Sequence, residues 1–270
     1  MSGMRLIDMH IHSDNSPDGT HSPMFMCEYA VRNGLRAAAF TDHCEIDKFF
    51  EQKYNSSVFH SYFECVKARN AFEGQLLVLI GLEIGQPLHN VDLSNKVINS
   101  KPYDYILGSV HTPRGQSLDI KEMEFDKLDI YKFMEDYFLE LAEIAQWNGC
   151  DALAHLTCPI RHIQGRYNID FDFSKISEVT DFLLETMIKN GKALEINTSG
   201  LRQSIGITMP DENIIKRYRE LGGTLITIGS DSHNAYDVGA GIEKGMSIAK
   251  KCGFDKVTFY VNREAMQIEI

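Results

Sequence analysis

Two histidines stand two residues apart near the start of the chain, at the end of a short apolar segment. They are His10 and His12. Side chains at positions i and i+2 project from the same face of a strand, so both imidazoles could bind one cation. Two exposed or hydrogen-bonded histidines would have the same spacing, so this pair alone is weak evidence for a metal site.

Similar polar residues follow most of the other apolar segments. They are His43, Glu83, His111, His155 and a second i, i+2 pair, Asp231 and His233. A single residue of this kind is usually a helix cap or a solvated loop residue. The carboxyl ends of parallel strands, however, meet at one mouth, where barrel enzymes place their catalytic groups. A shared site for more than one metal ion explains all of these positions together.

Short apolar segments alternate with longer amphipathic segments along the whole chain. The apolar segments predict strands at Arg5–His10, Arg36–Thr41, Leu76–Glu83, Tyr103–Ser109, Asp151–His155, Lys192–Asn197, Thr224–Gly229 and Lys256–Val261. A 3.6-residue period predicts helices at Pro23–Asn33, Val58–Ala71, Leu128–Asn148, Ile176–Asn190, Asp211–Leu221 and Gly239–Cys252. This alternation favours parallel strands, in a closed barrel or in an open doubly wound sheet. No linker or repeat divides the chain, so we expect one domain over residues 1–270.

Composition limits the partners and the location of the protein. The 270 residues carry a formal charge of −11, whereas long nucleic acids and anionic membranes need a basic face. The longest apolar run, Leu76–Gly85, is about half the ~20 residues that span a bilayer, and no secretory signal follows Met1. The six cysteines form no CxxC pair and are typical of a reducing compartment. We therefore expect a cytoplasmic protein; the sequence gives no indication of its oligomeric state.

The ordered set of polar segments resembles the PHP (polymerase and histidinol phosphatase) family of metal-dependent phosphoesterases. The similar segments run from residue 8 to residue 233: Asp8-Met9-His10-Ile11-His12, Thr41-Asp42-His43, Gly81-Leu82-Glu83, Gly108-Ser109-Val110-His111, Ala154-His155 and Gly229-Ser230-Asp231-Ser232-His233. The family fold is an α/β, distorted (β/α)7 TIM-like barrel with its metal site at the C-terminal ends of the strands. The resemblance therefore implies a closed barrel, a choice that the periodicity leaves open.

The resemblance also implies two to three divalent metal ions, which could be zinc, manganese or iron. A bridging carboxylate would join the first two sites: His10, His12, Glu83 and Asp231 for one ion, and Glu83, His111 and His155 for the other.

A third ion would lie between His43, His233 and Asp18. Many relatives have a histidine where this chain has Asp18, but a carboxylate can also bind these metals. Asp14 and His21 are nearby alternatives for the same role.

Charge arithmetic supports a phosphate ester as the substrate. Three divalent ions contribute about +6, and Asp18, Glu83 and Asp231 return three negative charges, which leaves a pocket of about +3. Such a pocket would attract a phosphate dianion despite the overall charge of −11. A metal-bridging hydroxide would then attack phosphorus. Glu83, Asp231 and His233 are the residues that we expect to serve this chemistry.

Two arginines and one asparagine follow later strand ends. Arg161 and Arg202 could grip a phosphate with two hydrogen bonds each, or form surface salt bridges. Asn197 could touch the substrate or orient its loop. The stretch Asn197–Arg202 is similar to the corresponding segment in histidinol-phosphate phosphatases of the family. This similarity implies a monoesterase that hydrolyses L-histidinol phosphate, a small phosphorylated metabolite, in histidine biosynthesis.

Other functions stay open at this point. A second PHP activity would act on nucleotide or oligonucleotide phosphoesters. A metal- or partner-binding module without catalysis should have lost ligands, and deamination or amide hydrolysis in a related barrel leaves Glu83 and the arginines less well explained. The loop Thr112–Asp126 is expected to cover the site, with Glu122 or Glu124 available to bind an amine of the substrate.

Overall fold

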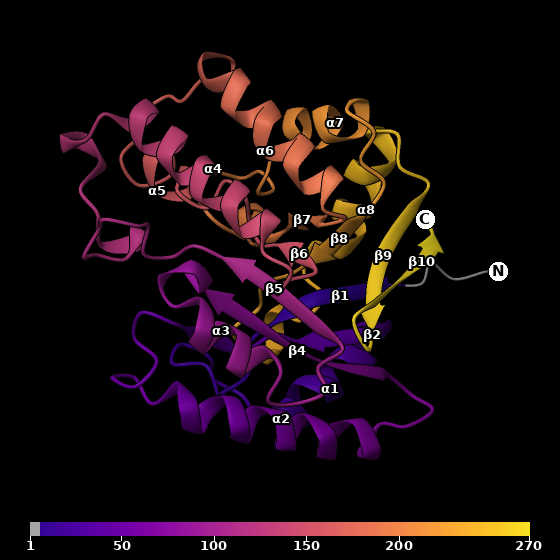
Figure 1. The fold of residues 1–270 in the computed structure, drawn as a ribbon. Helices are drawn as coiled ribbons and strands as arrows, with labels where there is room; N and C mark the ends of the chain where they lie inside the picture. Colours follow the sequence, from indigo (N-terminus) through magenta and orange to yellow (C-terminus); the bar gives the residue numbers. More distant parts are fainter. Residues whose placement is uncertain (1–5) are drawn as a thin grey trace.

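The centre of the computed structural model, which describes residues 6–270, is a parallel sheet that curls into a barrel (Figure 1). Its strands follow one another in the order β1 (Leu6–Ile11), β2 (Leu35–Phe40), β4 (Leu77–Gly85), β5 (Tyr105–Ser109), β6 (Ala152–Leu153), β7 (Ala193–Asn197) and β8 (Ile226–Gly229). A short strand, β3 (His43–Glu45), pairs with the end of β4. The first and last strands meet through a parallel bridge between Ile11 and Ser232, which nearly closes a barrel of seven strands.

Helices follow the strands and cover the outside of the barrel (Figure 1). They are α1 (Pro23–Arg32), α2 (Tyr54–Ala71), α3 (Val91–Ile98), α4 (Ile130–Gln146), α5 (Ile160–Ile163), α6 (Ser177–Lys189), α7 (Glu212–Glu220) and α8 (Ile242–Lys251). Side-chain oxygens of Ser22, Asn90, Asp129 and Asp211 accept hydrogen bonds from the first turns, as N-caps do. Over residues 6–270, no helix has both the length and the apolar character that crossing a bilayer requires.

A separate hairpin closes the amino-terminal end of the barrel. Its strands, β9 (Lys256–Val261) and β10 (Glu264–Glu269), pair only with each other and are antiparallel. Tyr260 of β9 is buried with the residues that fill the barrel, and its ring stacks on that of Tyr105 at 5.1 Å. With this end filled, the opposite end, where the strands finish, is left for the polar residues.

Most of the predicted elements are confirmed, and the exceptions have local causes. The residues Lys256–Val261 form a strand, but it belongs to the hairpin and not to the parallel barrel. The strand predicted over Asp151–His155 contains only two residues, because the chain turns away at His155, whose φ is 22°. Helix α3 was not predicted, since its eight residues are too few to show a helical period. Arg5, the predicted start of the first strand, lies outside the described residues.

Candidate metal centre

The carboxyl ends of the strands bring all nine predicted ligands into one cluster. Each ligand atom lies within 3.7 Å of an atom of another member. The members come from β1 and the loop after it, from β3 and β4, and from the ends of β5, β6 and β8: His10, His12, Asp18, His43, Glu83, His111, His155, Asp231 and His233. The residue types and the strand ends were therefore sufficient to predict eight of these side chains, whereas Asp18, in the loop after β1, was implied by the resemblance.

Glu83 lies at the centre of this cluster and is fully buried. Five imidazole nitrogens face its two oxygens, at 3.3 Å (His10), 3.3 Å (His12), 3.1 Å (His43), 3.4 Å (His111) and 3.0 Å (His155). Burial alone would raise the pKa of Glu83, but these histidines outweigh it and hold the pKa well below its usual value. The carboxylate is therefore ionised and can serve more than one cation.

Hydrogen bonds on the far side of the first two histidines fix where their lone pairs point. His10 Nδ1 donates to Glu195 Oε1 at 2.7 Å. His12 Nδ1 donates to Ser16 Oγ at 3.2 Å, because the Ser16 hydroxyl gives its own proton to Asp42 Oδ1 at 2.8 Å. Each Nε2 then carries a lone pair, and the two Nε2 atoms are only 2.8 Å apart. Two lone pairs at this distance repel each other unless they share a cation, so the donor set fits a divalent metal.

The donors form three overlapping groups in which all ligand atoms lie within 4.8 Å of one another. The groups are His10, His12 and Glu83; His12, His43 and His233; and His43, Glu83 and His111. Each shares at least two members with one of the three sets implied by the resemblance. The cluster can therefore hold a divalent metal ion.

A carboxylate that we did not predict, Glu45, joins two of these histidines. Its Oε1 lies 3.0 Å from His111 Nδ1 and 3.3 Å from His43 Nδ1, and its Oε2 accepts a hydrogen bond from Gln86 at 2.9 Å. Burial would raise the pKa of Glu45, but His111 and His43 lower it below its usual value. The i, i+2 spacing from His43 would have revealed Glu45 as a residue of the same strand face.

Glu195 is the second functional residue that the sequence did not reveal. It is fully buried on β7, where its Oε1 binds His10 Nδ1 and its Oε2 accepts the backbone N–H of His155 at 2.7 Å. Two ligand-bearing strand ends are thereby held by one carboxylate. Its position two residues before Asn197 was the available indication, since both then face the barrel interior.

A cavity of about 540 Å3 opens above the cluster. Arg161 lines it; its Nε is buried without a hydrogen-bond partner among residues 6–270, and its Nη2 contacts only the sulfur of Cys158, at 3.5 Å. The guanidinium is therefore free to bind an anion.

Two other predicted substrate residues lie outside the lining of this cavity. Arg202 donates to the backbone carbonyl of Ser230 at 2.8 Å and thus supports the end of β8. Asn197 is fully buried, with its Nδ2 3.2 Å from Asp231 Oδ2 and its Oδ1 bonded to Ser199. Of the two roles expected for Asn197, these contacts support the positioning one, because its amide lies against Asp231 and Ser199; direct contact with the substrate stays a prediction.

The family of the chain follows from its match to a known domain. The model of the PHP domain matches residues 8–199, more than half of the sequence. The chain belongs to the PHP family. This PHP chain is 32% identical to a probable histidinol-phosphatase of Clostridium acetobutylicum, with 94% of this chain and 96% of that protein covered. It is 28% identical to a histidinol-phosphatase of Lactococcus lactis, with 95% of each covered.

A solved structure shows the same PHP barrel. The crystal structure of histidinol phosphate phosphatase from Lactococcus lactis, complexed with zinc, L-histidinol and phosphate, matches this chain with a TM-score of 0.80. The match covers 97% of this chain and 99% of that chain at 24% identity. The (β/α)7 barrel that the resemblance implied is confirmed.

The loop after β5 of the PHP barrel covers the cavity with residues other than those expected. Asp119 and Lys121 line the cavity, whereas Glu122 and Glu124 are exposed and lie outside the lining. Glu124 instead pairs with Lys127 at 2.6 Å. The cause is a short 3₁₀ turn at Ile120–Glu122, which buries Ile120 and turns Glu122 toward solvent.

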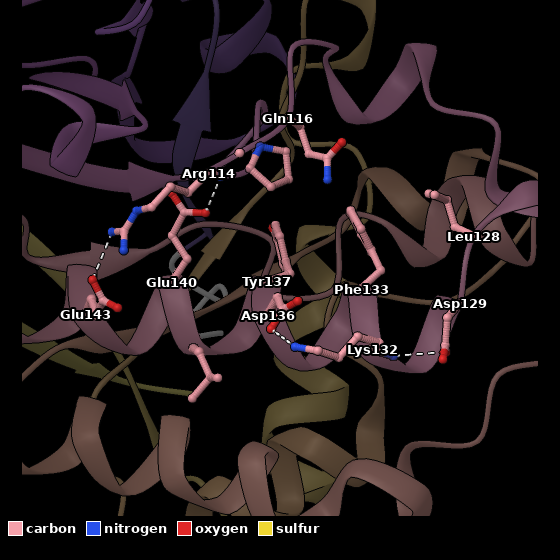
Figure 2. Close-up of a pocket in the computed structure, with 13 residues that line it drawn as sticks. Arg114, Gln116, Leu128, Asp129, Lys132, Phe133, Asp136, Tyr137, Glu140 and Glu143 are labelled. Atoms are coloured by element: carbon pink, nitrogen blue, oxygen red, sulfur yellow. Dashed lines mark hydrogen bonds and ion pairs between the residues drawn. The ribbon is translucent and has the colours of Figure 1, made fainter.

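A second cavity, of about 550 Å3, lies between α4 and the residues after Thr112 (Figure 2). Its charged side chains pair with one another: Arg114 with Glu143 at 2.8 Å, and Lys132 with Asp136. None of the predicted metal or substrate residues lines it. The barrel mouth, and not this cavity, is therefore the candidate active site.

Proposed function

We propose that this PHP enzyme is a metal-dependent phosphomonoesterase that hydrolyses L-histidinol phosphate to L-histidinol and phosphate. The observation that carries the proposal is the cluster of histidines around Glu83, with the guanidinium of Arg161 at the same cavity and its Nε without a hydrogen-bond partner among residues 6–270. The histidinol-phosphatases of Lactococcus lactis and Clostridium acetobutylicum support the choice of substrate. As a part of histidine biosynthesis, the reaction would take place in the cytoplasm, with residues 1–270 acting as one barrel domain.

Two to three divalent ions, zinc, manganese or iron, would be held by the nine clustered ligands. When bound, such ions lower the pKa of water and polarise phosphoryl oxygens. Asp231 and His155 reach the cluster at a cost, since both have positive φ values, 53° and 22°. Backbone strain of this kind costs roughly 1–3 kcal/mol and is typical of functional sites. Glu83, Asp231 and His233 are the residues that we propose to serve the hydrolysis directly.

The remaining residues position the cluster and the phosphate. Glu195 and Ser16 hold the Nδ1 atoms of His10 and His12, so that both Nε2 atoms face inward. Arg161 would bind two phosphoryl oxygens, because a guanidinium matches a phosphate with parallel hydrogen bonds.

Replacing Glu45 with glutamine should weaken metal binding by about 10- to 100-fold, the usual effect of losing a carboxylate that orients metal-bound histidines. The reason is that Glu45 Oε1 accepts a hydrogen bond from His111 Nδ1 at 3.0 Å, while its charge lies 3.3 Å from His43 Nδ1. Competition with a chelator measures the metal affinity directly. Asp47→Asn is the matched control, because Asp47 also binds Gln86, at 2.9 Å, but no histidine of the cluster. Equal metal affinity in Glu45→Gln and wild type would contradict this role.

The proposed substrate is tested by phosphate release from L-histidinol phosphate, nucleoside monophosphates and p-nitrophenyl phosphate, with the metal content measured on the same sample. We expect a kcat/KM for L-histidinol phosphate far above the others and two to three ions per chain. If the protein binds metal but prefers nucleoside monophosphates, the phosphoesterase activity is supported and L-histidinol phosphate is rejected as the substrate.

A further inference from the structure

Four carboxylates line the cavity at the barrel mouth: Asp18, Glu45, Asp119 and Asp231. Three of them contact histidines of the cluster, at 3.5 Å (Asp18 to His233), 3.0 Å (Glu45 to His111) and 3.5 Å (Asp231 to His12). Within the described part of the chain, Asp119 has no such contact. Among the four carboxylates of the cavity, Asp119 is therefore the one whose charge is not paired with a histidine of the cluster.

Asp119 keeps much of this charge available. Its Oδ1 accepts the backbone N–H of Lys121 at 3.0 Å, and its Oδ2 lies 3.7 Å from Lys121 Nζ. The Lys121 side chain is 61% exposed, so this ion pair is weak and screened by solvent. The Asp119 side chain is only 19% exposed. A cation that enters the cavity would thus find a largely desolvated carboxylate.

Asp119 also lies close to the group that we assign to phosphate. Both residues line the same cavity, and Asp119 contributes to raising the pKa of Arg161, after the larger effects of Cys158, of burial and of Asp231. In L-histidinol phosphate the ammonium group is on the carbon next to the one that carries the phosphate ester. A carboxylate that binds this ammonium must therefore stand within a few ångströms of the phosphate-binding arginine.

We infer that Asp119 binds the ammonium group of the substrate and thereby gives the enzyme its preference for phosphate monoesters with a neighbouring amine. This inference rests on the proposed phosphatase function of the same site and adds the residue that reads the non-phosphate end. The phosphate would be held at the cluster and Arg161, and the amine would face the loop after β5.

The test compares Asp119→Asn with wild type on L-histidinol phosphate and on its analogue without the amine, 3-(imidazol-4-yl)propyl phosphate. Asparagine keeps an oxygen that can accept the Lys121 N–H, so the loop retains its cap. We expect the KM for L-histidinol phosphate to rise about tenfold or more, as for loss of a charge-assisted hydrogen bond. The kinetics of the analogue should change by less than about twofold. Glu122→Gln, in the same loop but exposed, is the control and should leave both substrates unaffected.

Two results would overturn the inference: equal losses on both substrates, which indicate a structural role in the loop, or no loss on either. A second pair, phosphoethanolamine and ethyl phosphate, separates this inference from the proposed substrate. If the wild-type enzyme does not prefer L-histidinol phosphate over the other phosphate monoesters, the proposed substrate is rejected. The role of Asp119 in binding an ammonium group is then supported if wild type prefers phosphoethanolamine over ethyl phosphate and Asp119→Asn removes that preference. It is rejected if wild type hydrolyses the two compounds with equal kcat/KM.

Discussion

Glu83→Gln is expected to lower kcat/KM by roughly 10³-fold or more, because the bound ions that supply the catalysis would be lost with the carboxylate. Glutamine has the same shape, but it removes one negative charge and places an amide group where five imidazole nitrogens approach within 3.4 Å. The amide cannot bridge two cations, because it carries no charge and only one of its two polar atoms is an oxygen. Metal content per chain should therefore fall together with activity, and both are measured on one preparation.

The control for this variant is another buried carboxylate, Glu140 of α4, which is 5% exposed and lines the second cavity (Figure 2). Glu140→Gln should retain metal and kcat/KM even if it lowers the melting temperature. A Glu83→Gln enzyme with full metal content and wild-type kcat/KM would remove Glu83 from the site.

Arg161→Lys is expected to lower kcat/KM for a phosphate monoester by about 100-fold or more, the scale for losing one preorganised donor to a developing anion. Lysine keeps the charge but lacks the planar fork that binds two phosphoryl oxygens. Within residues 6–270 the side chain of Arg161 donates a hydrogen bond to Cys158 and to no member of the histidine cluster, so metal content should stay unchanged. This combination of retained metal and lost kcat/KM distinguishes a phosphate-binding residue from a ligand.

Arg166→Lys provides the comparison, because Arg166 is in the same segment but donates to the backbone carbonyl of Lys121 at 3.0 Å and does not line the cavity. It should retain most of the activity. If Arg161→Lys kept wild-type kcat/KM, the phosphate would have to be held by other groups of the cavity.

The side chains of the cluster could be predicted because most of them stand where an apolar strand ends. Parallel strands direct their carboxyl ends to one mouth, so His10, Glu83 and Asp231 come together although they are far apart in the chain. The alternation of apolar and amphipathic segments could not by itself distinguish a barrel from an open sheet. That distinction depends on the contact between β1 and β8, which involves only a few backbone groups.

The supporting residues were not predicted, because they act through partners on distant strands. Glu195 binds His10 across a separation of 185 residues, and no local period encodes which strands face each other inside a barrel. The direction of side chains in loops is also not encoded by a local period. Asp119 faces the cavity and Glu122 does not, because the burial of Ile120 fixes the orientation of the turn. The third metal position and the role of Arg202 in phosphate binding stay predictions.

The seam between β1 and β8 also affects how the protein reaches and keeps its native state. The backbone hydrogen bonds that join the two strand ends include Asp231 N–H to His10 O and His12 N–H to Ser232 O, both at 2.8 Å. His10 and His12 leave the ribosome more than 200 residues before Asp231, so the site is completed only when the barrel closes. An ion held from both sides of the seam would bind the closed barrel and not the open one, and would stabilise it by mass action. The bound ions would thus also stabilise the barrel against local opening between β1 and β8.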